Sequence, residues 1–573
     1  MAERSFLNGV PQYTLEDFEH EFADRHLLHG VVARWAEQAP DRPAIIEVDT
    51  GKEYTYQQFD RISTLLAVKL IEMGFKKGDF LATFLPLLAE HIFLEYACFK
   101  IGVIHAPLDI RLKAPDVIRS LDLIQARGFV FPGKTPRSDF SALGEAVREN
   151  CPFVEHLVQL APPEQTLSGA LSGVVLYDEA LRAMDNPVRL PAWKSYLEAT
   201  SQVGETDGAQ VIYTTGSTGL PKPALLSHRN ITCQNMGLGG AFGMSEGRML
   251  VNLPPSHVGC QAEQLMTTLF WGGTAVVLHM FDAVRTLKAI QDYRVEIFGQ
   301  IPAMYAMQWR LPDYGQYDLS SLRLVLYGGQ VVGRPFLEQL SRMAPNFGTG
   351  LGLTEMAGFA TYTPLGRTVD EITGSVGYDM PVTPLSIRQP MNPDGTAGKE
   401  LPDGQTGEIC FTGPQVFIDY VGHKEAYKRT VSKEGVCYTG DVGYKDARGL
   451  HLVGRSKLVI KPKGYQVHPS QIEDHFAQLK DKVAACGAVG APHEVFGEGV
   501  VLFVETQPDA SLTRDELESH AKHIASYMRP LHYVVVPTGT LPLNRAAKTD
   551  YVSLKARALV EIEKLRAQGG WDR

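Results

Sequence analysis

Strand and helix patterns alternate along this chain, and this alternation constrains the fold more than any other feature of the sequence. Two strand patterns, Pro43–Val48 and Glu53–Tyr56, flank a turn, and Tyr56–Met73 then carries apolar residues at helical spacing. The rhythm continues with strand or helix patterns at Phe80–Leu85, Leu88–Lys100, Val103–Leu108, Val276–Leu278, Ala283–Tyr293, Ile297–Gln300 and Leu324–Tyr327. We expect Leu88–Lys100 to be an amphipathic helix. Strands separated by helices predict an α/β fold, with parallel sheets covered on both faces.

Size, charge and cysteine usage are typical of a large enzyme. The chain has 573 residues, more than a single core accommodates, so at least two domains are expected. A formal net charge of −10 disfavours nucleic-acid binding, because nucleic acid is usually met by a basic face. The seven cysteines are scattered and never form a Cys-x-x-Cys pair, which predicts reduced thiols with neither a disulfide framework nor a zinc site.

No targeting segment is evident in the sequence. The acidic residues Glu16, Asp17 and Glu19 precede any long apolar run, so a signal peptide is not expected. The uncharged stretch Gln264–Phe281 contains two adjacent glycines and is interpreted as a buried helix followed by the strand Thr274–Leu278, not as a membrane span. We therefore expect a cytoplasmic protein.

The run Tyr213–Lys222 alternates hydroxyl and glycine residues and ends in a lysine, after an apolar pair suited to a strand end. Glycines allow backbone N–H groups to turn inward, and threonine and serine add hydroxyl donors, so the loop suits phosphate oxygens. It lacks the Gly-x4-Gly-Lys-[Ser/Thr] spacing of a Walker loop. Taken alone, such a run would be interpreted as a flexible surface loop.

Four later motifs favour the phosphate interpretation. They are Gly348–Glu355 (Gly-Thr-Gly-Leu-Gly-Leu-Thr-Glu), Tyr438–Asp441 (Tyr-Thr-Gly-Asp), Gly454–Lys457 with its continuation to Val467, and Leu541–Thr549. Together with the loop they resemble, in order along the chain, the adenylate-forming superfamily of acyl-CoA synthetases, adenylation domains and luciferases. The resemblance is strongest to an AMP-forming acyl-CoA synthetase and covers essentially the whole chain.

The resemblance implies an ATP site. The positions used by the family for the nucleotide correspond to Thr214, Thr215, Gly216, Ser217, Thr218, Gly219, Lys222, Gly328, Gly329, Gln330, Gly350, Leu351, Gly352, Asp441 and Arg455. Mg²⁺ on the ATP phosphates is assigned to Glu355 with Thr218, beside Thr354; carboxylate and phosphate oxygens are the ligands that this hard cation prefers. Asp441 is assigned to the ribose, because an ionised carboxylate accepts hydrogen bonds from a vicinal diol.

The chain departs from the family next to this motif. Leu351 stands where an aromatic residue usually stacks on adenine. Adenine would therefore pack against aliphatic surface or against Tyr327.

The resemblance also implies a mobile lid. It assigns the catalytic lysine of adenylation to Lys548, the hinge to Lys457, the thiol-transfer face to Lys461 and the pantetheine tunnel to Gly464; Ala547 replaces the family's usual glycine. The implied domains are residues 1–455, an α/β N-terminal domain of parallel sheets packed with helices plus a small β-barrel-like subdomain, and residues 456–573, a small mobile α+β C-terminal domain.

The acyl pocket is assigned by the same resemblance to His257, Gly259, Gly352 and Ala357. A packing role near a strand end suits His257 equally well. Acetate-specific relatives have a tryptophan at the position of Gly352. A glycine there implies room for medium-chain, alicyclic or aromatic carboxylic acids.

The implied function is an AMP-forming carboxylic acid–CoA ligase that uses ATP, Mg²⁺ and coenzyme A. ATP and the acid form an acyl-adenylate, and the thiol of CoA then displaces AMP. Two alternatives stay open, namely a stand-alone ligase that loads a separate carrier protein and an inactive binding or scaffold protein that retains the fold. Luciferase-like oxygenation is disfavoured, since the segment Ser256–Gly259 lacks a His-His pair. Neither nucleic acid nor a membrane segment is expected, and a homodimer stays open.

Overall fold

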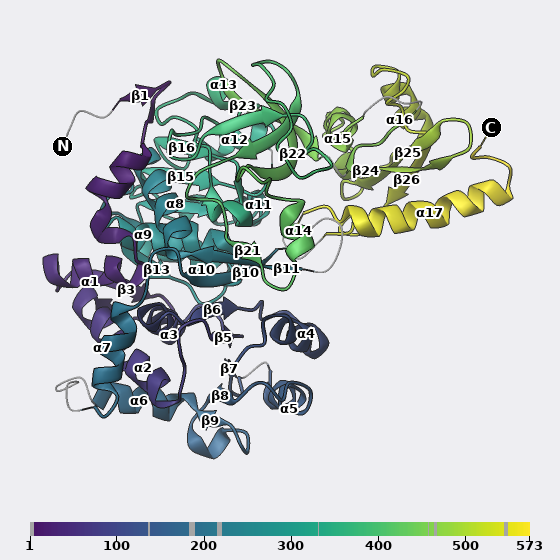
Figure 1. Cartoon of the computed structure of the whole chain (residues 1–573). Coiled ribbons are helices and arrows are strands. Elements are labelled where there is room, and N and C mark those ends of the chain that lie inside the picture. The colour runs from purple at the N-terminus through teal and green to yellow at the C-terminus, as the bar shows by residue number, and fades with distance from the viewer. Residues whose placement is uncertain are drawn as a thin grey trace. The chain divides into compact units, whose positions relative to one another are not determined.

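The structure, a computed structural model, describes residues 5–135, 138–182, 190–214, 221–330, 332–455, 458–462, 467–543 and 548–572. The chain divides into two compact units (Figure 1). The first comprises Met1–Thr214, Lys222–Leu385 and Phe411–Cys437, and the second comprises Thr215–Pro221, Ser386–Cys410 and Tyr438–Arg573. The domain boundary expected between residues 455 and 456 stays a prediction.

A seven-stranded sheet forms one layer of the first unit. In sheet order its strands are β16 (Asn346–Thr349), β15 (Leu324–Tyr327), β14 (Ile297–Gln300), β12 (Arg248–Val251), β13 (Thr274–Val277), β3 (Pro43–Glu47) and β4 (Glu53–Thr55). Neighbouring strands are parallel except for the antiparallel β3–β4 hairpin. The predicted turn and the predicted parallel pairing are therefore confirmed.

Three helices pack on this sheet: α10 (Ala283–Asp292), α11 (Pro302–Trp309) and α12 (Arg334–Leu340). Their apolar side chains, including Leu287, Tyr305 and Leu337, are buried against Val276 and Phe298 of the strands. Consecutive side chains of a strand point to opposite faces, so a parallel sheet needs helices on both sides to bury them. The layer arrangement is visible in Figure 1.

A second sheet of the first unit has eight strands. In order they are β21 (Asp419–Tyr420), β11 (Lys222–Ser227), β10 (Gly208–Thr214), β6 (Ile104–Pro107), β5 (Phe80–Thr83), β7 (Gly128–Pro132), β8 (His156–Leu160) and β9 (Leu171–Ser172). Strands from β10 to β9 pair in parallel, whereas β21, β11 and β10 pair antiparallel. In the sequence, the candidate phosphate loop connects the antiparallel strands β10 and β11.

The helix predicted over Leu88–Lys100 is α3 (Ala89–Ile101), and its predicted amphipathic character is wrong. Every residue of α3 is buried except Glu90 and Leu94, which are partly exposed. The cause is tertiary packing, because this helix is in contact with α1 (Leu28–Gln38), α2 (Tyr56–Glu72), α7 (Trp193–Ser201) and β6. A helix that is covered on every side buries its polar residues as well.

The remaining helices of the first unit complete the layers. They are α4 (Ala114–Ile124), α5 (Ser141–Asn150), α6 (Gly173–Arg182), α7 (Trp193–Ser201), α8 (His228–Ala241), α9 (Thr267–Phe270), α13 (Val369–Ile372) and α14 (Lys424–Lys428). Small strand pairs are formed by β1 (Phe6–Leu7) with β2 (Val10–Pro11) and by β17 (Gly352–Leu353) with β18 (Gly358–Phe359).

The stretch Gln264–Phe281 has the structure expected for it. A π-helical segment, Gly259–Met266, continues into α9, and β13 follows. None of the helices in the described part of the chain is both long and apolar enough to span a membrane.

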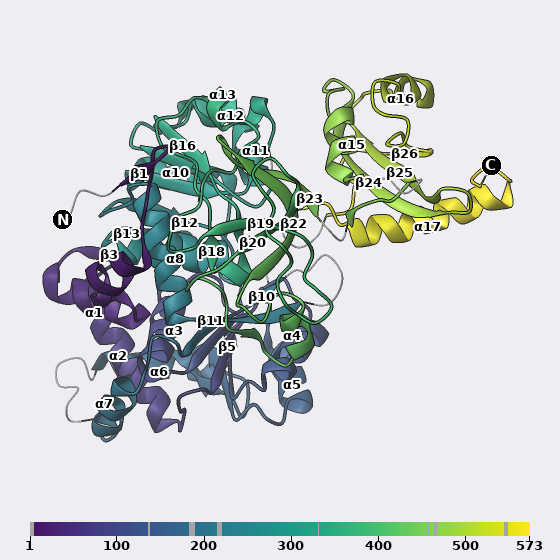
Figure 2. The same ribbon diagram turned by 45° about the horizontal axis from the view of Figure 1, so that its top comes forward.

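The second unit contains a four-stranded sheet and a separate α+β part. The sheet has the order β19 (Leu385–Arg388), β20 (Gly407–Phe411), β22 (Cys437–Asp446) and β23 (Gly449–Arg455), seen side by side in Figure 2. Its strands fall within residues 1–455, the expected N-terminal domain, for which a small β-barrel-like subdomain is predicted.

The α+β part has the strand order β24 (Val483–His493), β25 (Gly497–Thr506) and β26 (His532–Val536). Alternate residues of β25 point to different cores. Leu502 is buried among residues of α15 (Pro469–Phe476) and α16 (Arg514–Ala521), and Phe503 among residues of α17 (Tyr551–Ala567). The sheet is thus covered on both faces, as the period of a strand requires.

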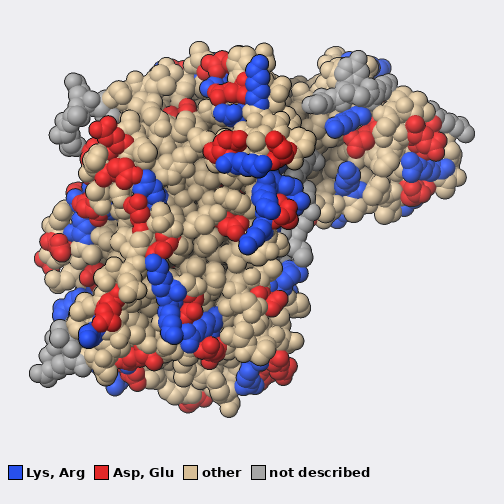
Figure 3. Space-filling model, in the orientation of Figure 1, with Lys and Arg blue, Asp and Glu red and all other residues tan. Residues whose placement is uncertain are grey.

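Charge is mixed on the face of the molecule shown in Figure 3. Lysine and arginine are interspersed with aspartate and glutamate there, and no extended basic stripe is visible. This distribution is consistent with the net charge of −10.

Candidate active site

Two paired residues of antiparallel strands, Thr214 and Lys222, flank the candidate phosphate loop in the sequence, and we call this pair the neck of the loop. β10 ends at Thr214 and β11 begins at Lys222, and these two residues pair directly. The hydroxyl oxygen of Thr214 is buried and has no hydrogen-bond partner among the described residues. A buried hydroxyl without a partner is uncommon and suits a ligand at the neck. The predicted ligands Thr215, Gly216, Ser217, Thr218 and Gly219 lie outside the described residues.

Lys222, Tyr420 and Glu355 come together at this neck. The ammonium nitrogen of Lys222 lies 4.2 Å from the centre of the Tyr420 ring, within cation–π range. The Tyr420 hydroxyl donates to Oε1 of Glu355. Burial, and then the neighbouring Glu355 carboxylate, raise the pKa of Tyr420 far above its usual value. Tyr420 therefore keeps its proton and orients the carboxylate.

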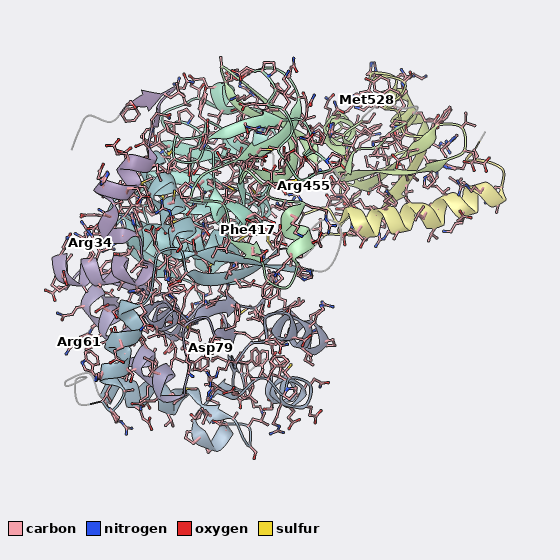
Figure 4. The ribbon with its side chains drawn as sticks, in the orientation of Figure 1. Arg34, Arg61, Asp79, Phe417, Arg455 and Met528 are labelled. Carbon is pink, nitrogen blue, oxygen red and sulfur yellow. The ribbon has the colours of Figure 1, made fainter. Side chains whose placement is uncertain are left out.

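The Glu355 carboxylate fits a divalent cation. It lies in the short helical turn Thr354–Met356 after β17, and the backbone N–H of Phe417, labelled in Figure 4, donates to its carbonyl oxygen at 3.0 Å. Its Oε2 accepts no hydrogen bond from the described residues. One oriented, partly buried carboxylate oxygen with free acceptor capacity matches the way in which proteins share Mg²⁺ with phosphates.

The two candidate adenine segments follow neighbouring parallel strands. Gly328-Gly329-Gln330 follows β15, and Gly350-Leu351-Gly352 follows β16. The hydroxyl of Thr349 donates to the carbonyl of Tyr327 at 2.7 Å and ties the two strand ends together. Ligands of open α/β sheets bind outside the carboxyl ends of the strands, and both segments lie there.

Tyr327 is unsuited to stacking on adenine. Its ring is buried in the core, 5.5 Å from the ring of Phe336. Adenine would therefore have to pack against aliphatic surface, to which Leu351 contributes.

The two predicted acyl-pocket glycines, Gly259 and Gly352, both lie close to Glu263. A Cβ atom placed on Gly352 would lie 2.6 Å from Cδ1 of Phe359 and 3.1 Å from Oε1 of Glu263. A Cβ on Gly259 would lie 3.4 Å from Oε2 of the same glutamate. Gly358 has φ of +127°, which only glycine adopts readily, and it lies between Glu263 and the side chain of Gln234.

Glu263 is an unusual residue in such a place. It lies on the π-helical segment Gly259–Met266, and the backbone N–H of Phe359 donates to its carboxylate. Burial raises the pKa of Glu263 to about 7. A carboxyl group in apolar surroundings is poised between its neutral and ionised forms near neutral pH.

The other two predicted acyl-pocket residues have clear backbone roles. His257 is partly buried, its backbone N–H donates to the carbonyl of Pro254 at 3.0 Å, and its carbonyl accepts from the N–H of Cys260 at 3.1 Å. Ala357 is fully buried with φ of +54°, at the end of the turn that carries Glu355.

Asp441, Arg455 and Lys548 form a cluster in the second unit. Asp441 and Arg455 pair across β22 and β23, with Nε of Arg455 3.0 Å from Oδ1 of Asp441 (Figure 4 labels Arg455). Burial raises the pKa of Asp441, against the attraction of Arg455 and Lys548. Burial and the Arg455 charge lower the pKa of Lys548, against Asp441. The structure thus brings together three residues predicted from separate motifs.

Lys461 is exposed, and its backbone N–H donates to Glu498 at 2.6 Å. The predicted hinge residue Lys457 and the predicted tunnel residue Gly464 lie outside the described residues, as does Ala547.

Sequence reasoning missed Tyr420, Glu263, Gln234 and Phe359. One signal was available for Glu263, which is the only acidic residue between Glu246 and Asp282. Burying a lone carboxylate in an apolar stretch costs free energy, so such a residue is a candidate for a functional role. The other three residues have no local signature.

Comparisons with known proteins identify the family and the fold of the chain. The family model described as AMP-binding enzyme matches residues 32–421, and the model described as AMP-binding enzyme C-terminal domain matches residues 471–548. A putative acyl-CoA synthetase of Bacillus subtilis, YngI, is 26% identical over 559 residues, covering 93% of this chain and 98% of that protein. 4-Coumarate–CoA ligase 3 of Arabidopsis thaliana is 28% identical over 549 residues, covering 92% and 91%. The solved structure of ATP-bound MatB from Rhodopseudomonas palustris has a TM-score of 0.75 at 22% identity, covering 93% of this chain and 99% of that one, and shows the same fold.

Proposed function

The chain belongs to the family of AMP-binding enzymes, and from this membership we propose that it is an AMP-forming carboxylic acid–CoA ligase for medium-chain, alicyclic or aromatic acids. The coarser assignment, an ATP-binding ligase of the acyl-CoA synthetase type, follows from the family and from relatives named as acyl-CoA synthetases and 4-coumarate–CoA ligases. The observation that carries the proposal is the cluster of Lys222, Tyr420 and Glu355 at the neck of the phosphate loop.

The first half-reaction must overcome charge repulsion. A carboxylate attacks the α-phosphorus of ATP, and both reactants are negative. Mg²⁺ held by Glu355 would neutralise phosphate charge. In this proposal Lys222 and the hydroxyl of Thr214 bind phosphate oxygens, and Lys548 stabilises the charge that develops in the transition state. The carboxylate oxygen bonds to phosphorus, and pyrophosphate leaves.

The second half-reaction uses the acyl-adenylate as an activated acyl donor. The thiolate sulfur of CoA bonds to the acyl carbon, and AMP leaves with the electron pair of the broken C–O bond. In this proposal residues 456–573 form a lid that turns about Lys457, withdrawing Lys548 and presenting Lys461 and Gly464. Asp441 and Arg455 hold the ribose and phosphate of the nucleotide.

The range of acids is proposed from the family resemblance, because acetate-specific relatives have a tryptophan at the position that Gly352 holds in this chain. Gly352 is exposed and contributes no side chain that would exclude a longer or cyclic acid. Each methylene that fits an apolar acyl pocket improves discrimination by roughly 1–3 kcal/mol.

The test is ATP–pyrophosphate exchange with a panel of acids, followed by thioester formation with CoA. We expect exchange with octanoic, cyclohexanecarboxylic or cinnamic acids to exceed exchange with acetate by more than about tenfold per two methylenes accommodated. Highest rates with acetate would refute the proposed acid class. Exchange without a CoA ester would favour loading of a carrier protein, and exchange with none of the acids would favour a scaffold protein.

A further inference from the structure

Lys548 lies near the end of a chain segment whose two ends, the parts of it that the structure describes, pair with each other. Leu543 pairs antiparallel with Thr549, and the backbone N–H of Asp550 donates to the carbonyl oxygen of Pro542 at 2.9 Å. We call the segment from Pro542 to Asp550 the lysine loop. Because Lys548 directly precedes the paired residue Thr549, the groups that hold this end of the loop set the position from which its side chain extends.

Directly after the lysine loop, the side chain of Tyr551 is held by the carboxylate of Glu473. The Tyr551 hydroxyl lies 2.9 Å from Oε1 and 2.9 Å from Oε2 of Glu473, which belongs to α15. The backbone N–H of Ala488 in β24 donates to the same Oε1 at 2.8 Å. One carboxylate therefore joins α15, β24 and the first residue of α17, through bonds that are roughly twice as strong when the acceptor is ionised.

This pair is costly to keep as a mere packing contact. Burial raises the pKa of Glu473 to about 7, although its bonds to Ala488 and Tyr551 lower it. Burial, and then the charge of Glu473, raise the pKa of Tyr551 far above its usual value, so the phenol keeps its proton and donates. Apolar side chains would fill the same space without the cost of desolvating a carboxylate, which makes the pair a candidate for a specific task.

The end of the lysine loop is also packed closely on β24. A Cβ atom placed on Gly487 of β24 would lie 3.2 Å from Cγ2 of Thr549, so the threonine lies against a strand position without a side chain. The next residue of the strand, Ala488, donates to the carboxylate that holds Tyr551. A shift of Tyr551 relative to β24 would therefore be passed over two residues to Thr549, and from there to Lys548.

We propose that Glu473 and Tyr551 are positioning residues for Lys548, which fix the C-terminal end of the lysine loop so that the ammonium group meets the charge that develops during acyl-adenylate formation. Neither side chain contacts the reacting atoms in this proposal, and both act through the main chain from Thr549 to Tyr551. The inference rests on the proposed function, which assigns Lys548 to the first half-reaction. A loss confined to that half-reaction is therefore its signature.

The experiment measures both half-reactions of Tyr551→Phe separately, by ATP–pyrophosphate exchange and by thioester formation from a supplied acyl-adenylate. We expect kcat of exchange to fall about ten- to hundredfold, the effect of a small misplacement of a catalytic group, with KM for ATP and the rate of thioester formation nearly unchanged. Tyr533→Phe is the matched control. Tyr533 is partly buried in the same α+β part, and its hydroxyl makes no hydrogen bond to the described residues.

Two further comparisons separate positioning from general loss of structure. Tyr551→Phe should not slow exchange further when it is added to Lys548→Ala, because the tyrosine acts only through that lysine. Glu473→Gln keeps an oxygen that accepts from Tyr551 or Ala488, so it should retain exchange activity that Glu473→Leu loses.

Because the comparison of the two half-reactions is internal to each variant, partial loss of folded protein lowers both alike. The inference is overturned if Tyr551→Phe leaves exchange unchanged or slows both half-reactions equally, if it slows Lys548→Ala further, or if Tyr533→Phe has the same effect. Absence of exchange in the unchanged protein with every acid tested would contradict the proposed function itself, and the inference with it.

Discussion

The Tyr420 hydroxyl is a positioning group for the Glu355 carboxylate, and its removal gives a prediction at the residue scale. Tyr420→Phe keeps the ring under Lys222 but deletes the donor to Oε1 of Glu355. A hydrogen bond to a charged group contributes about 1.5–3 kcal/mol, so the exchange rate at limiting Mg²⁺ should fall roughly ten- to hundredfold. The loss should shrink at saturating Mg²⁺, which a titration of exchange against Mg²⁺ concentration measures.

Tyr427→Phe is the matched control for this change. The Tyr427 ring packs against Phe417 with centroids 5.4 Å apart, as the Tyr420 ring does at 4.7 Å, but it has no bond to Glu355. An equal effect of the two substitutions on the Mg²⁺ dependence would show that Tyr420 acts only through packing.

Single residues were predictable from the sequence where a motif of several residues surrounds them. Glu355, Asp441 and Lys548 each lie in such a motif, and the structure brings Asp441 together with Lys548. The Tyr420 hydroxyl, in contrast, donates to Glu355, which lies 65 positions away in the sequence, and no local pattern encodes a contact between residues so far apart. Finding this contact required the fold.

At the element scale, Gly350 follows β16 and allows the backbone there to lie close to the backbone of Thr361. A Cβ atom on Gly350 would overlap the carbonyl oxygen of Thr361 and would lie 2.9 Å from the ring of Phe359. Backbone cannot move aside as a side chain can, so Gly350→Ala should destabilise the first unit by at least about 2 kcal/mol. The loss should appear as a lower urea midpoint in equilibrium unfolding.

Gly315→Ala provides the comparison, because nothing lies within 4 Å of the position of its Cβ. That change should leave the midpoint within about 0.5 kcal/mol, as surface substitutions usually do. Equal midpoints for the two variants would contradict the role given to Gly350.

Elements were predictable where their signal is local. The bounds of β14 and β15 agree with the sequence patterns at Ile297–Gln300 and Leu324–Tyr327, because short apolar runs between turns are typical of buried strands. The full burial of α3 was not predictable, because Glu95 and Lys100 are of residue types that usually face solvent. Lys100 is instead bonded to Asp60 of α2 at 2.6 Å, which allows its burial.

At the scale of the whole molecule, the family resemblance was recognised from the order of motifs along the chain, and the fold class was predicted from the alternation of strands and helices. The number of strands in each sheet and their order depend on long-range pairing. β21 (Asp419–Tyr420), for example, completes a sheet whose other strands precede residue 228. Its two residues are too few to carry a strand pattern, yet they place Tyr420 beside Glu355.

The proposed lid gives the last prediction, because it assigns the two half-reactions to different lysines. Lys548→Ala should slow acyl-adenylate formation by about 10²–10³, the effect of losing a charge that acts mainly in the transition state, and should largely spare CoA transfer from a supplied acyl-adenylate. Lys461→Ala is the matched charge deletion on an exposed segment of the same unit, and it should weaken the second step more than the first.

Lys457→Pro should hinder rotation about the hinge, since proline fixes its own backbone angle, and should slow the overall reaction more than either half-reaction measured alone. Each half-reaction is measured separately, by pyrophosphate exchange and by thioester formation from a synthetic acyl-adenylate. The cluster of Lys548 with Asp441 and Arg455 allows a competing outcome, in which the lysine only supports the local structure. Equal loss of both half-reactions in Lys548→Ala would select that outcome and remove the alternating lid from the mechanism.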